Sequence, residues 1–260
     1  MTSSGTSDDF FSLNGLVALV IGASGGLGSA IAREFARRGA FVVLAGRRGD
    51  ELRRLAKTIS IFNTNVDTVI VDVTDQSSVR SAINGVLSKH GRIDVLVNAH
   101  GINFRAPAEE MPLSEWQKVL DVNLKGTFLT CQEVGKIMIK QGHGKIINIS
   151  STAAGRGFKW GYSAYSPSKA GVEALTRVLA AEWGKHGINV NAIAPYFIRT
   201  ELTSKFLENK DVFTDIMGSI PLGRLGTPDD VAAAAVFLAS RASDWINGEV
   251  LHIDGGRNVI

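Results

Sequence analysis

The start of the chain constrains the fold most, because an apolar run leads directly into a glycine-rich turn and then into a helical pattern. The run 17–21 is continuously apolar, and Gly22, Gly26 and Gly28 follow it with the spacing G-x-x-x-G-x-G. A second apolar run, 41–45, comes after the helix. This order predicts a βαβ unit. Glycines in its first turn let the backbone approach a pyrophosphate at the positive end of the helix, so the turn favours dinucleotide binding over a plain connection.

Strand and helix patterns alternate over the rest of the chain. Strands are expected at 17–21, 41–45, 68–71, 95–98, 145–150, 189–194 and 250–253. Helices are expected at 26–38, 50–60, 77–90, 114–140, 165–185 and 228–240. Several of these strands are continuously apolar, as strands buried on both faces are. The alternation predicts an α/β fold: a doubly wound, Rossmann-like parallel sheet of about seven strands with helices on both faces.

The segment 196–227, after the sixth strand, is expected to be irregular. Connections longer than about 12–15 residues are often functional lids. This one would close over the carboxyl ends of the strands, where sheets of this kind bind ligands.

Length and composition fit one globular domain. The chain has 260 residues, 45% hydrophobic and 20% charged, so residues 13–260 are expected to form a single domain behind a disordered leader, 1–12. The leader lacks the basic start and apolar core of a signal peptide, and no apolar run approaches the roughly 20 residues of a membrane span. The net charge of +3 is scattered, which argues against a nucleic-acid partner. A cytoplasmic location is expected.

Two residues with reactive side chains are predicted to be structural. Cys131 is the only cysteine and lies in an apolar helical stretch, so it is expected to be a buried, inert thiol. His100 follows the fourth strand, near the expected cofactor site, but no metal-ligating residues lie near it in the sequence. No metal site is therefore predicted.

Tyr165 and Lys169 form the pattern with the clearest chemistry. On a helix, side chains at i and i+4 share a face, with Cβ atoms about 5–6 Å apart. The ammonium would lower the pKa of the phenol from its usual value of about 10, and such a group can donate or accept the proton of a carbonyl–alcohol pair. Pro167 fits if the helix begins close to Tyr165. Tyr162 is the competing tyrosine, but Ser166 at its i+4 position is not a cation.

These motifs together resemble the short-chain dehydrogenase/reductase family, from about Leu13 to Asp254. The matching elements stand in the family's order: the glycine turn, Asp72-Val73, Asn98 to Gly101, Asn123, Ser151, Tyr165 with Lys169, and Pro195 with Ile198 and Thr200. Three positions depart from the family pattern: Ile21 replaces Thr, Ala99-His100 replaces Asn-Ala, and Tyr196 replaces Gly. They lie near the expected cofactor site and leave the tyrosine–lysine pair intact.

The resemblance implies a catalytic set of Asn123, Ser151, Tyr165 and Lys169. Tyr165 would transfer the proton, and Ser151, with Ser150 as the alternative, would hold the substrate oxygen. Lys169 would also hold the nicotinamide ribose, and Asn123 would open its helix locally and position a proton-relaying water. The implied cofactor-binding residues are Gly22, Ser24, Gly26, Leu27, Gly28, Arg47, Arg48, Asp72, Val73, Asn98, Tyr165, Lys169, Ile198 and Thr200.

Arg47 and Arg48 predict NADP rather than NAD. They follow the second strand, where an acidic residue would bind the ribose 2′-hydroxyl of NAD, and no Asp or Glu stands at that turn. Arginines can clasp a 2′-phosphate instead. The alternative is a solvated basic turn. Asp72 would contact the adenine by family resemblance, whereas a turn-capping role is the default for a lone Asp.

The predicted function is interconversion of a secondary alcohol and a ketone on a small-molecule substrate. Segments 102–108 and 221–226 resemble gluconate 5-dehydrogenases, and similar stretches occur in 3-oxoacyl-carrier-protein reductases. A sugar acid is the expected substrate, and an acyl thioester or another neutral ketone is the alternative. A non-catalytic nucleotide-binding sensor is a second alternative, which the retained tyrosine and lysine disfavour. In this family the helices at 114–140 and 165–185 pair across a two-fold axis, which implies a homotetramer.

Loops after the fourth and fifth strands bear on the substrate. Arg105, Arg156 and Lys159 would attract an anion, or else all three are solvated surface charges. An apolar wall for a bulkier ketone is the competing prediction, built from Tyr196, Phe197, Trp160 and Phe206.

Overall fold

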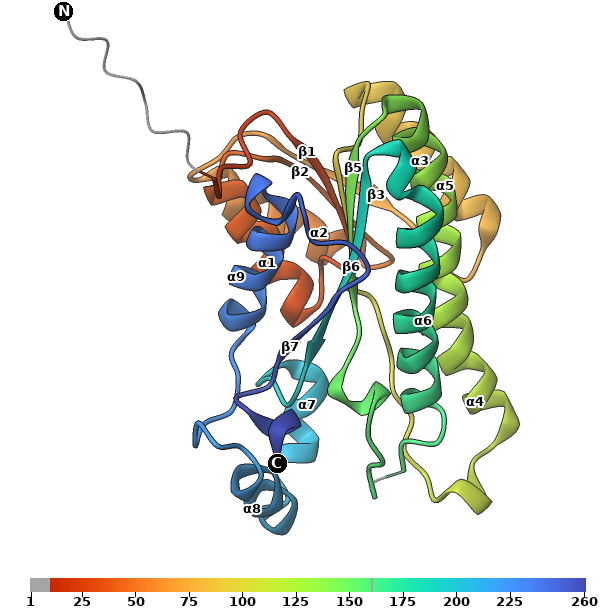
Figure 1. Ribbon diagram of the computed structural model, residues 1–260, viewed down its shortest axis with the longest axis vertical. Coiled ribbons are helices and arrows are strands. Elements are labelled where there is room, and N and C mark those ends of the chain that lie inside the picture. Colours follow the sequence, from red (N-terminus) through yellow and green to blue (C-terminus); the bar gives the residue numbers. More distant parts are fainter. Residues whose placement is uncertain (1–9, 160) are drawn as a thin grey trace, which may run out of the picture.

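A computed structural model describes residues 10–159 and 161–260, and its centre is one parallel sheet of seven strands (Figure 1). The strands are β1 (Val17–Ile21), β2 (Phe41–Gly46), β3 (Val66–Ile70), β4 (Val95–Asn98), β5 (Gly144–Ile149), β6 (Ile188–Pro195) and β7 (Val250–Ile253). Their order across the sheet is β3-β2-β1-β4-β5-β6-β7, and every neighbouring pair is parallel. The predicted doubly wound α/β fold is confirmed.

Helices cover both faces of the sheet (Figure 1). The described helices are α1 (Gly26–Arg37), α2 (Gly49–Ser60), α3 (Gln76–His90), α4 (Leu113–Leu120), α5 (Gly126–Gln141), α6 (Tyr165–Trp183), α7 (Glu201–Leu207), α8 (Lys210–Gly218) and α9 (Pro228–Ala239). Side chains of α1, α2 and α9 form one core with the sheet, and side chains of α3, α5 and α6 form the other. The strands have apolar side chains on both faces because both faces are covered.

Side chains at the helix ends explain where two of the helices begin. The Asp75 carboxylate accepts a hydrogen bond from Ser77 N and starts α3. Thr227 and Asp230 form a capping box ahead of α9, with Pro228 in its first turn. Both arrangements satisfy backbone N–H groups that a helix leaves unpaired at its start.

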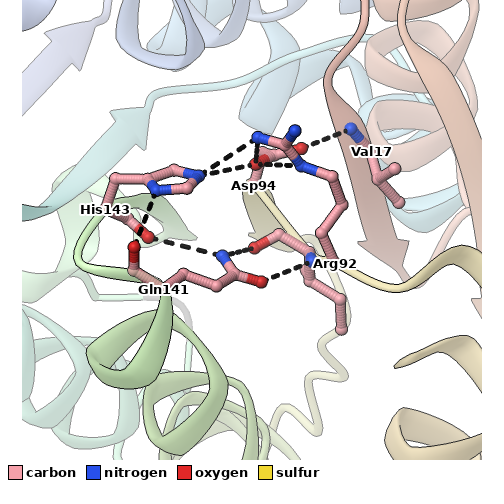
Figure 2. Close-up of polar contacts among 6 residues, drawn as sticks. Val17, Arg92, Asp94, Gln141 and His143 are labelled. Carbon is pink, nitrogen blue, oxygen red and sulfur yellow. Dashed lines mark hydrogen bonds and ion pairs between the residues drawn. The ribbon is translucent and has the colours of Figure 1, made fainter. Parts of the chain in front are cut away.

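A polar cluster around Asp94 fixes the amino ends of the central strands (Figure 2). The buried Asp94 carboxylate accepts hydrogen bonds from Val17 N at 2.8 Å and from Arg92 Nε at 2.9 Å, and it lies 3.0 Å from His143 Nε2. The Gln141 side chain bonds both backbone groups of Ile93. These contacts join β1, β4 and the turn before β5 at the edge of the sheet opposite the carboxyl ends.

The prediction of an irregular segment over 196–227 is wrong, because the segment contains α7 and α8. Thr200 and Thr203 form a capping box that starts α7, and the Asn209 side chain accepts from two backbone N–H groups at the start of α8. Ile216 and Leu225 pack with Phe197 in a small core of their own. Helices of seven and nine residues carry too few turns for a clear 3.6-residue period.

The single helix predicted at 114–140 is also wrong, because a π-helical turn at Asp121–Lys125 separates α4 from α5. This turn holds Asn123, which is poorly suited to a regular helix interior. The local opening that the family resemblance implies at Asn123 is present.

Residues 1–9 of the predicted leader and Trp160 of the predicted apolar wall lie outside the described residues. The last part of the leader is described, and the ring of Phe11 lies 6.5 Å from that of Phe237 on α9. Extension of a single domain over 13–260 stays a prediction. No helix in the described part of the chain is both long enough and apolar enough to cross a bilayer.

Candidate active site

Two adjoining cavities lie at the carboxyl edge of the sheet, next to the ends of β1 and β4. Their volumes are about 420 Å³ and about 350 Å³. Both are lined by Gly25, Arg48, Ala99, His100 and Gly101, so they form one continuous groove, called here the central groove. The order of the strands along the chain reverses between β1 and β4, and doubly wound sheets bind ligands at this point.

The glycine turn after β1 has the shape that a diphosphate needs. Gly22 has φ +83°, and a Cβ on it would lie 2.6 Å from His100 N. A Cβ on Gly28 would lie 2.3 Å from Gly22 O. The N-cap of α1 is Gly25, which offers no side-chain hydrogen bond to the helix. No N-cap side chain therefore occupies the first N–H groups of α1, and this feature and the close approach of the backbone at Gly22 and Gly28 fit a dinucleotide.

Arg48 and Arg47 make one end of the central groove cationic. Arg48 donates to Ser24 O at 3.0 Å and to Ser24 Oγ at 3.3 Å, and it pairs with Glu51 at 3.0 Å. Arg47 lines the cavity beside Asp72. Hydrogen bonds from Thr74, and to a lesser degree the charge of Arg47, lower the pKa of Asp72. Asp72 thus caps its own turn, which is the default role, and it also lines the cavity.

Most of the predicted cofactor-binding residues come together in the central groove. One cavity is lined by Gly26, Leu27, Arg48, Tyr165, Lys169, Ile198 and Thr200, and the other by Gly22, Ser24, Arg47, Arg48, Asp72 and Val73. Gly28 and Asn98 line neither cavity. Asn98 is buried, and its side chain donates to Asn148 Oδ1 at 2.9 Å. The sequence carried no motif for Glu201, which lines the groove at the start of α7.

Tyr165 and Lys169 share a face at the start of α6. The helix begins at Tyr165, so Pro167 lies in its first turn, as predicted. Lys169 Nζ lies 5.8 Å from the centroid of the Tyr165 ring and donates to Ile149 O at 2.7 Å. Both side chains line the central groove.

The expected lowering of the Tyr165 pKa by Lys169 is not found. Burial raises the pKa of Tyr165 to about 12, and the nearby Tyr162 phenol acts in the same direction. A hydrogen bond with Ser151 and the charge of Arg105 only partly oppose this rise in pKa. Burial lowers the pKa of Lys169 to about 8. Desolvation disfavours the charged form of both groups, and it outweighs the attraction on which the sequence-based expectation rested.

The two candidate serines after β5 point to different partners. Ser151 lines the groove beside Tyr165, and its hydroxyl accepts from Ala153 N at 3.2 Å. Ser150 is buried, and its hydroxyl is 2.9 Å from Glu173 Oε1 and 3.3 Å from Lys169 O. This geometry favours Ser151 as the group that meets a substrate oxygen.

Asn123 joins the π-helical turn to the loop after β4. Its side chain donates to Ile102 O at 2.9 Å and to Ser168 Oγ at 3.0 Å, and it accepts from Ile102 N at 2.8 Å. A Cβ on Gly101 would lie 3.4 Å from both Asn123 Oδ1 and Lys169 Nζ. The structure therefore brings Asn123, Ser151, Tyr165 and Lys169 to one region around the groove.

Comparison with known proteins decides the family. Residues 22–258 match the family described as enoyl-(acyl carrier protein) reductase. The chain is 43% identical to D-threitol dehydrogenase of Mycolicibacterium smegmatis, with 96% of this chain and 95% of that protein covered. It is 39% identical to gluconate 5-dehydrogenase of Gluconobacter oxydans, covering 96% and 98%. The chain belongs to the short-chain dehydrogenase/reductase family.

A solved member of the short-chain dehydrogenase/reductase family has the same fold throughout. The crystal structure of a gluconate 5-dehydrogenase from Burkholderia cenocepacia, in complex with NADP and tartrate, superposes with a TM-score of 0.93. It shares 36% identity and covers 97% of this chain and 98% of its own. As a member of this family, the chain is an oxidoreductase that acts on CH–OH groups with NAD(P).

The substrate end of this short-chain dehydrogenase/reductase is the aromatic region around Tyr162, Tyr196 and Phe206, and Arg105 lies within it. The Arg257 guanidinium lies at its margin, 5.9 Å from the centroid of the Tyr196 ring. Arg105, on the loop after β4, donates to the Tyr162 hydroxyl at 3.0 Å, and its guanidinium lies 3.9 Å from the centroid of the Phe206 ring on α7. The Tyr162 ring is 5.5 Å from the Tyr165 ring. Tyr196 and Phe197 also stack edge to face here, 4.8 Å apart. The Phe197 and Phe206 rings are stacked 5.9 Å apart, so the predicted cation and the described part of the predicted apolar wall lie together.

Arg156 and Lys159 do not join Arg105. Arg156 donates to the carbonyl oxygens of Asn258 and Ile260 near the end of the chain. Lys159 pairs with Asp215 on α8 at 2.8 Å. The predicted three-residue basic cluster is reduced to Arg105, because partners elsewhere hold the other two.

Several polar atoms near the substrate end are buried without a hydrogen-bond partner among the described residues. They are Asn103 Oδ1, Arg105 Nε, Thr152 Oγ1, Ser163 Oγ and Ser166 Oγ. All belong to the loops after β4 and β5 or to the start of α6, and Thr152, Ser163 and Ser166 are close in the chain to Ser151 or Tyr165. Of the five residues the sequence pointed only to Arg105, because only packing shows which polar atoms lack a partner.

Cys131 is a structural residue. Burial raises the pKa of the Cys131 thiol to about 12, which confirms the inert cysteine. Among residues 10–159 and 161–260, no group of three or more His, Cys, Asp or Glu side chains is placed to hold a metal ion.

Proposed function

We propose that the protein is an NADP-dependent dehydrogenase/reductase that interconverts a secondary alcohol and a ketone on a sugar acid of the gluconate/5-ketogluconate type. The observation that carries the substrate class is Arg105, which lies half-buried at the substrate end beside Tyr162. In the part of the chain that the structure describes, no carboxylate pairs with this guanidinium. A partly desolvated cation next to the catalytic residues favours a substrate carboxylate.

The catalytic residues divide the chemistry among them. Tyr165 gives its proton to the carbonyl oxygen in reduction and takes it back in oxidation. Ser151 holds the same oxygen in place, and Lys169 and Asn123 keep the surrounding backbone in position through Ile149 and Ile102. Bound NADP would supply or accept the hydride. The glycine turn, the start of α1 and the two arginines after β2 would hold it.

Support for NADP comes from the cationic end of the central groove. Arg47 and Arg48 line it, and no acidic residue stands at the turn after β2. A carboxylate there would repel a 2′-phosphate, whereas a guanidinium binds it in a charge-assisted, bidentate manner. The solved Burkholderia relative contains NADP. NAD is the less favoured cofactor.

A neutral polyol is the second candidate substrate. The relative with 43% identity is a D-threitol dehydrogenase, and the unpartnered hydroxyl and amide groups of Asn103, Thr152 and Ser163 suit any polyhydroxylated chain. A 3-oxoacyl thioester is the remaining alternative. A non-catalytic sensor has the least support, since the chain retains both Tyr165 and Lys169, which a sensor would not need.

Initial rates with 5-ketogluconate and with a neutral ketose of similar size, each with NADPH and NADH, test the proposal. We expect faster turnover with NADPH, and a preference for 5-ketogluconate that decreases as salt is added. Arg105→Met should raise KM for 5-ketogluconate and leave the neutral ketose unaffected, and Arg156→Met is the matched control. If the neutral ketose is preferred at all ionic strengths, the sugar-acid proposal is wrong, and a polyol or an acyl thioester becomes the proposed substrate. If no compound in a panel of carbonyl substrates is turned over, the non-catalytic sensor is the function that remains.

We also propose a homotetramer and a cytoplasmic location. Exposed apolar side chains on α4, α5 and α6 support the proposed tetramer: Leu113 is 77% exposed, Phe128 40% and Val178 52%. Exposed apolar patches of this kind mark surfaces that another subunit covers.

A further inference from the structure

His100 lies in the central groove with a ring nitrogen that has no partner. The residue lines both cavities of the groove. Its Nδ1 is buried and without a hydrogen bond among the described residues, while its Nε2 lies 3.4 Å from Thr127 Oγ1. A buried polar atom left unpaired costs free energy, so native structures retain one where a ligand, ion or water completes it.

The neighbours of His100 determine which proton the ring carries. Thr127 Oγ1 donates its only proton to Asn123 O at 2.8 Å. His100 Nε2 must therefore be the donor in its contact with Thr127, and Nδ1 is then the acceptor of a neutral ring. Burial and the charge of Lys169 lower the pKa of His100 to about 3, and a hydrogen bond with the Val122 backbone acts in the opposite direction. The groove thus contains an unused acceptor.

The ring of His100 is enclosed at the end of the groove that holds the arginines. A Cβ on Gly126 would lie 3.2 Å from His100 Nε2 and 2.8 Å from Val73 Cγ2. The backbone of His100 lies against Gly22 of the glycine turn. Val73, Gly22 and Arg47 line the same cavity, so the acceptor lies at the nucleoside half of the groove.

We propose that His100 Nδ1 accepts a hydrogen bond from the 3′-hydroxyl of the adenosine ribose of NADP. An acceptor needs a donor, and phosphate oxygens are acceptors. On this ribose the 2′-oxygen carries the phosphate, so the 3′-hydroxyl is the sugar donor that remains. The inference rests on the proposed cofactor and is independent of the substrate.

Calorimetric titration with NADP and with its 3′-deoxyadenosine analogue, without substrate, tests the inference. Wild type should bind the analogue about three- to tenfold more weakly, the effect of losing one neutral hydrogen bond. His100→Leu, similar in size and without an acceptor, should bind both nucleotides equally. His100→Asn, whose amide oxygen replaces Nδ1, should keep part of the discrimination. Thermal unfolding by circular dichroism checks that the variants are folded.

Two results would overturn the assignment of His100. One is equal affinity of wild type for NADP and the analogue, and the other is the same discrimination in wild type and His100→Leu. If His100→Leu does not fold, wild type and His100→Asn still decide the question. If wild type binds no NADP at all, the proposed cofactor fails, and that outcome is distinguishable from binding without discrimination.

Discussion

At the residue scale, burial disfavours the charged forms of Tyr165 and Lys169, the proposed catalytic pair. Burial raises the pKa of Tyr165 to about 12 and lowers the pKa of Lys169 to about 8. Among residues 10–159 and 161–260, no carboxylate forms an ion pair with Lys169, whose ammonium donates to the Ile149 carbonyl at 2.7 Å. Functional sites commonly hold such costs.

Replacing Tyr165 by Phe should reduce turnover about 10²- to 10⁴-fold, because general acid–base catalysis contributes that much. The dissociation constant of NADPH should remain within about tenfold of wild type, since a single neutral hydrogen bond is the most that is lost. Stopped-flow hydride transfer and fluorescence titration measure the two quantities. Tyr162→Phe is the matched control: it lies 5.5 Å away and should change KM more than kcat. Near-normal turnover of Tyr165→Phe would contradict the mechanism.

Lys169 gives the unfolding free energy a pH dependence of predictable sign. Its pKa is about 8 in the folded protein against an ordinary value of 10.5. Between these pH values the unfolded chain binds more protons than the folded one, so the contribution of Lys169 to stability rises with pH through this window. Below pH 8 the free-energy cost of burying the charged Lys169 ammonium is fully present. The unfolding free energy of wild type, measured in urea at pH 7 and 9.5, should therefore increase relative to that of Lys169→Met. If the difference between the two proteins is the same at both pH values, the pKa assigned to Lys169 is wrong.

At the element scale, the π-helical turn at Asp121–Lys125 places Asn123 where a regular helix would not. One extra residue in the turn lets the side chain reach both backbone groups of Ile102 and the Ser168 hydroxyl. The turn thereby joins α4 and α5 to the loop after β4 and to α6. Such π-turns inside helices are frequent at functional sites.

Asn123→Ala should destabilise the protein by about 2–4 kcal/mol, because buried groups of Ile102 and Ser168 lose their partners. Turnover should fall as well, since the loop beside Lys169 is released. Asn123→Asp is the matched variant: when protonated, its carboxyl keeps the acceptor for Ile102 N and one of the two donors of the amide. At a pH where this carboxyl is protonated, chemical unfolding should rank wild type above Asn123→Asp, and Asn123→Asp above Asn123→Ala. Equal stability of all three would show that the turn does not depend on this side chain.

At the scale of the whole molecule, the two helical layers differ in what they leave exposed. Helices α4, α5 and α6 lie on the same side of the molecule (Figure 1). Each has an exposed apolar side chain: Leu113 on α4, Phe128 on α5 and Val178 on α6. The opposite face includes Ile61 after α2, which is 84% exposed. A family member that assembles through α4–α6 would cover the first set and leave Ile61 in solvent.

Phe128→Asp combined with Val178→Lys should convert the tetramer into smaller species, because charges in an apolar interface cannot be desolvated cheaply. Multi-angle light scattering at working concentration measures the mass directly. Ile61→Asp is the control, and its mass should equal that of wild type. A monomeric wild type would overturn the proposed assembly, and a double variant that stays tetrameric would place the interface elsewhere.

The sequence by itself determined the architecture, and its resemblance to the family predicted the candidate catalytic set. Strands buried on both faces must be apolar, and a helix must keep one apolar face, so these local periods revealed the sheet and most of its helices. The spacing of the glycines and the i, i+4 relation of Tyr165 and Lys169 are local patterns too, so the sequence predicted both the glycine turn and the shared helix face. Short helices such as α7 and α8 were missed because seven to nine residues hold too little periodic signal.

Only the tertiary structure decided how the side chains are partnered. Ser150 and Ser151 are neighbours in sequence, yet packing turns the first to Glu173 and leaves the second beside Tyr165. Desolvation of Tyr165 likewise depends on everything around it, so its pKa shift had the opposite sign to that expected from Lys169 alone. Burial and hydrogen-bond partners are sums over residues distant in the chain, and no local pattern encodes them.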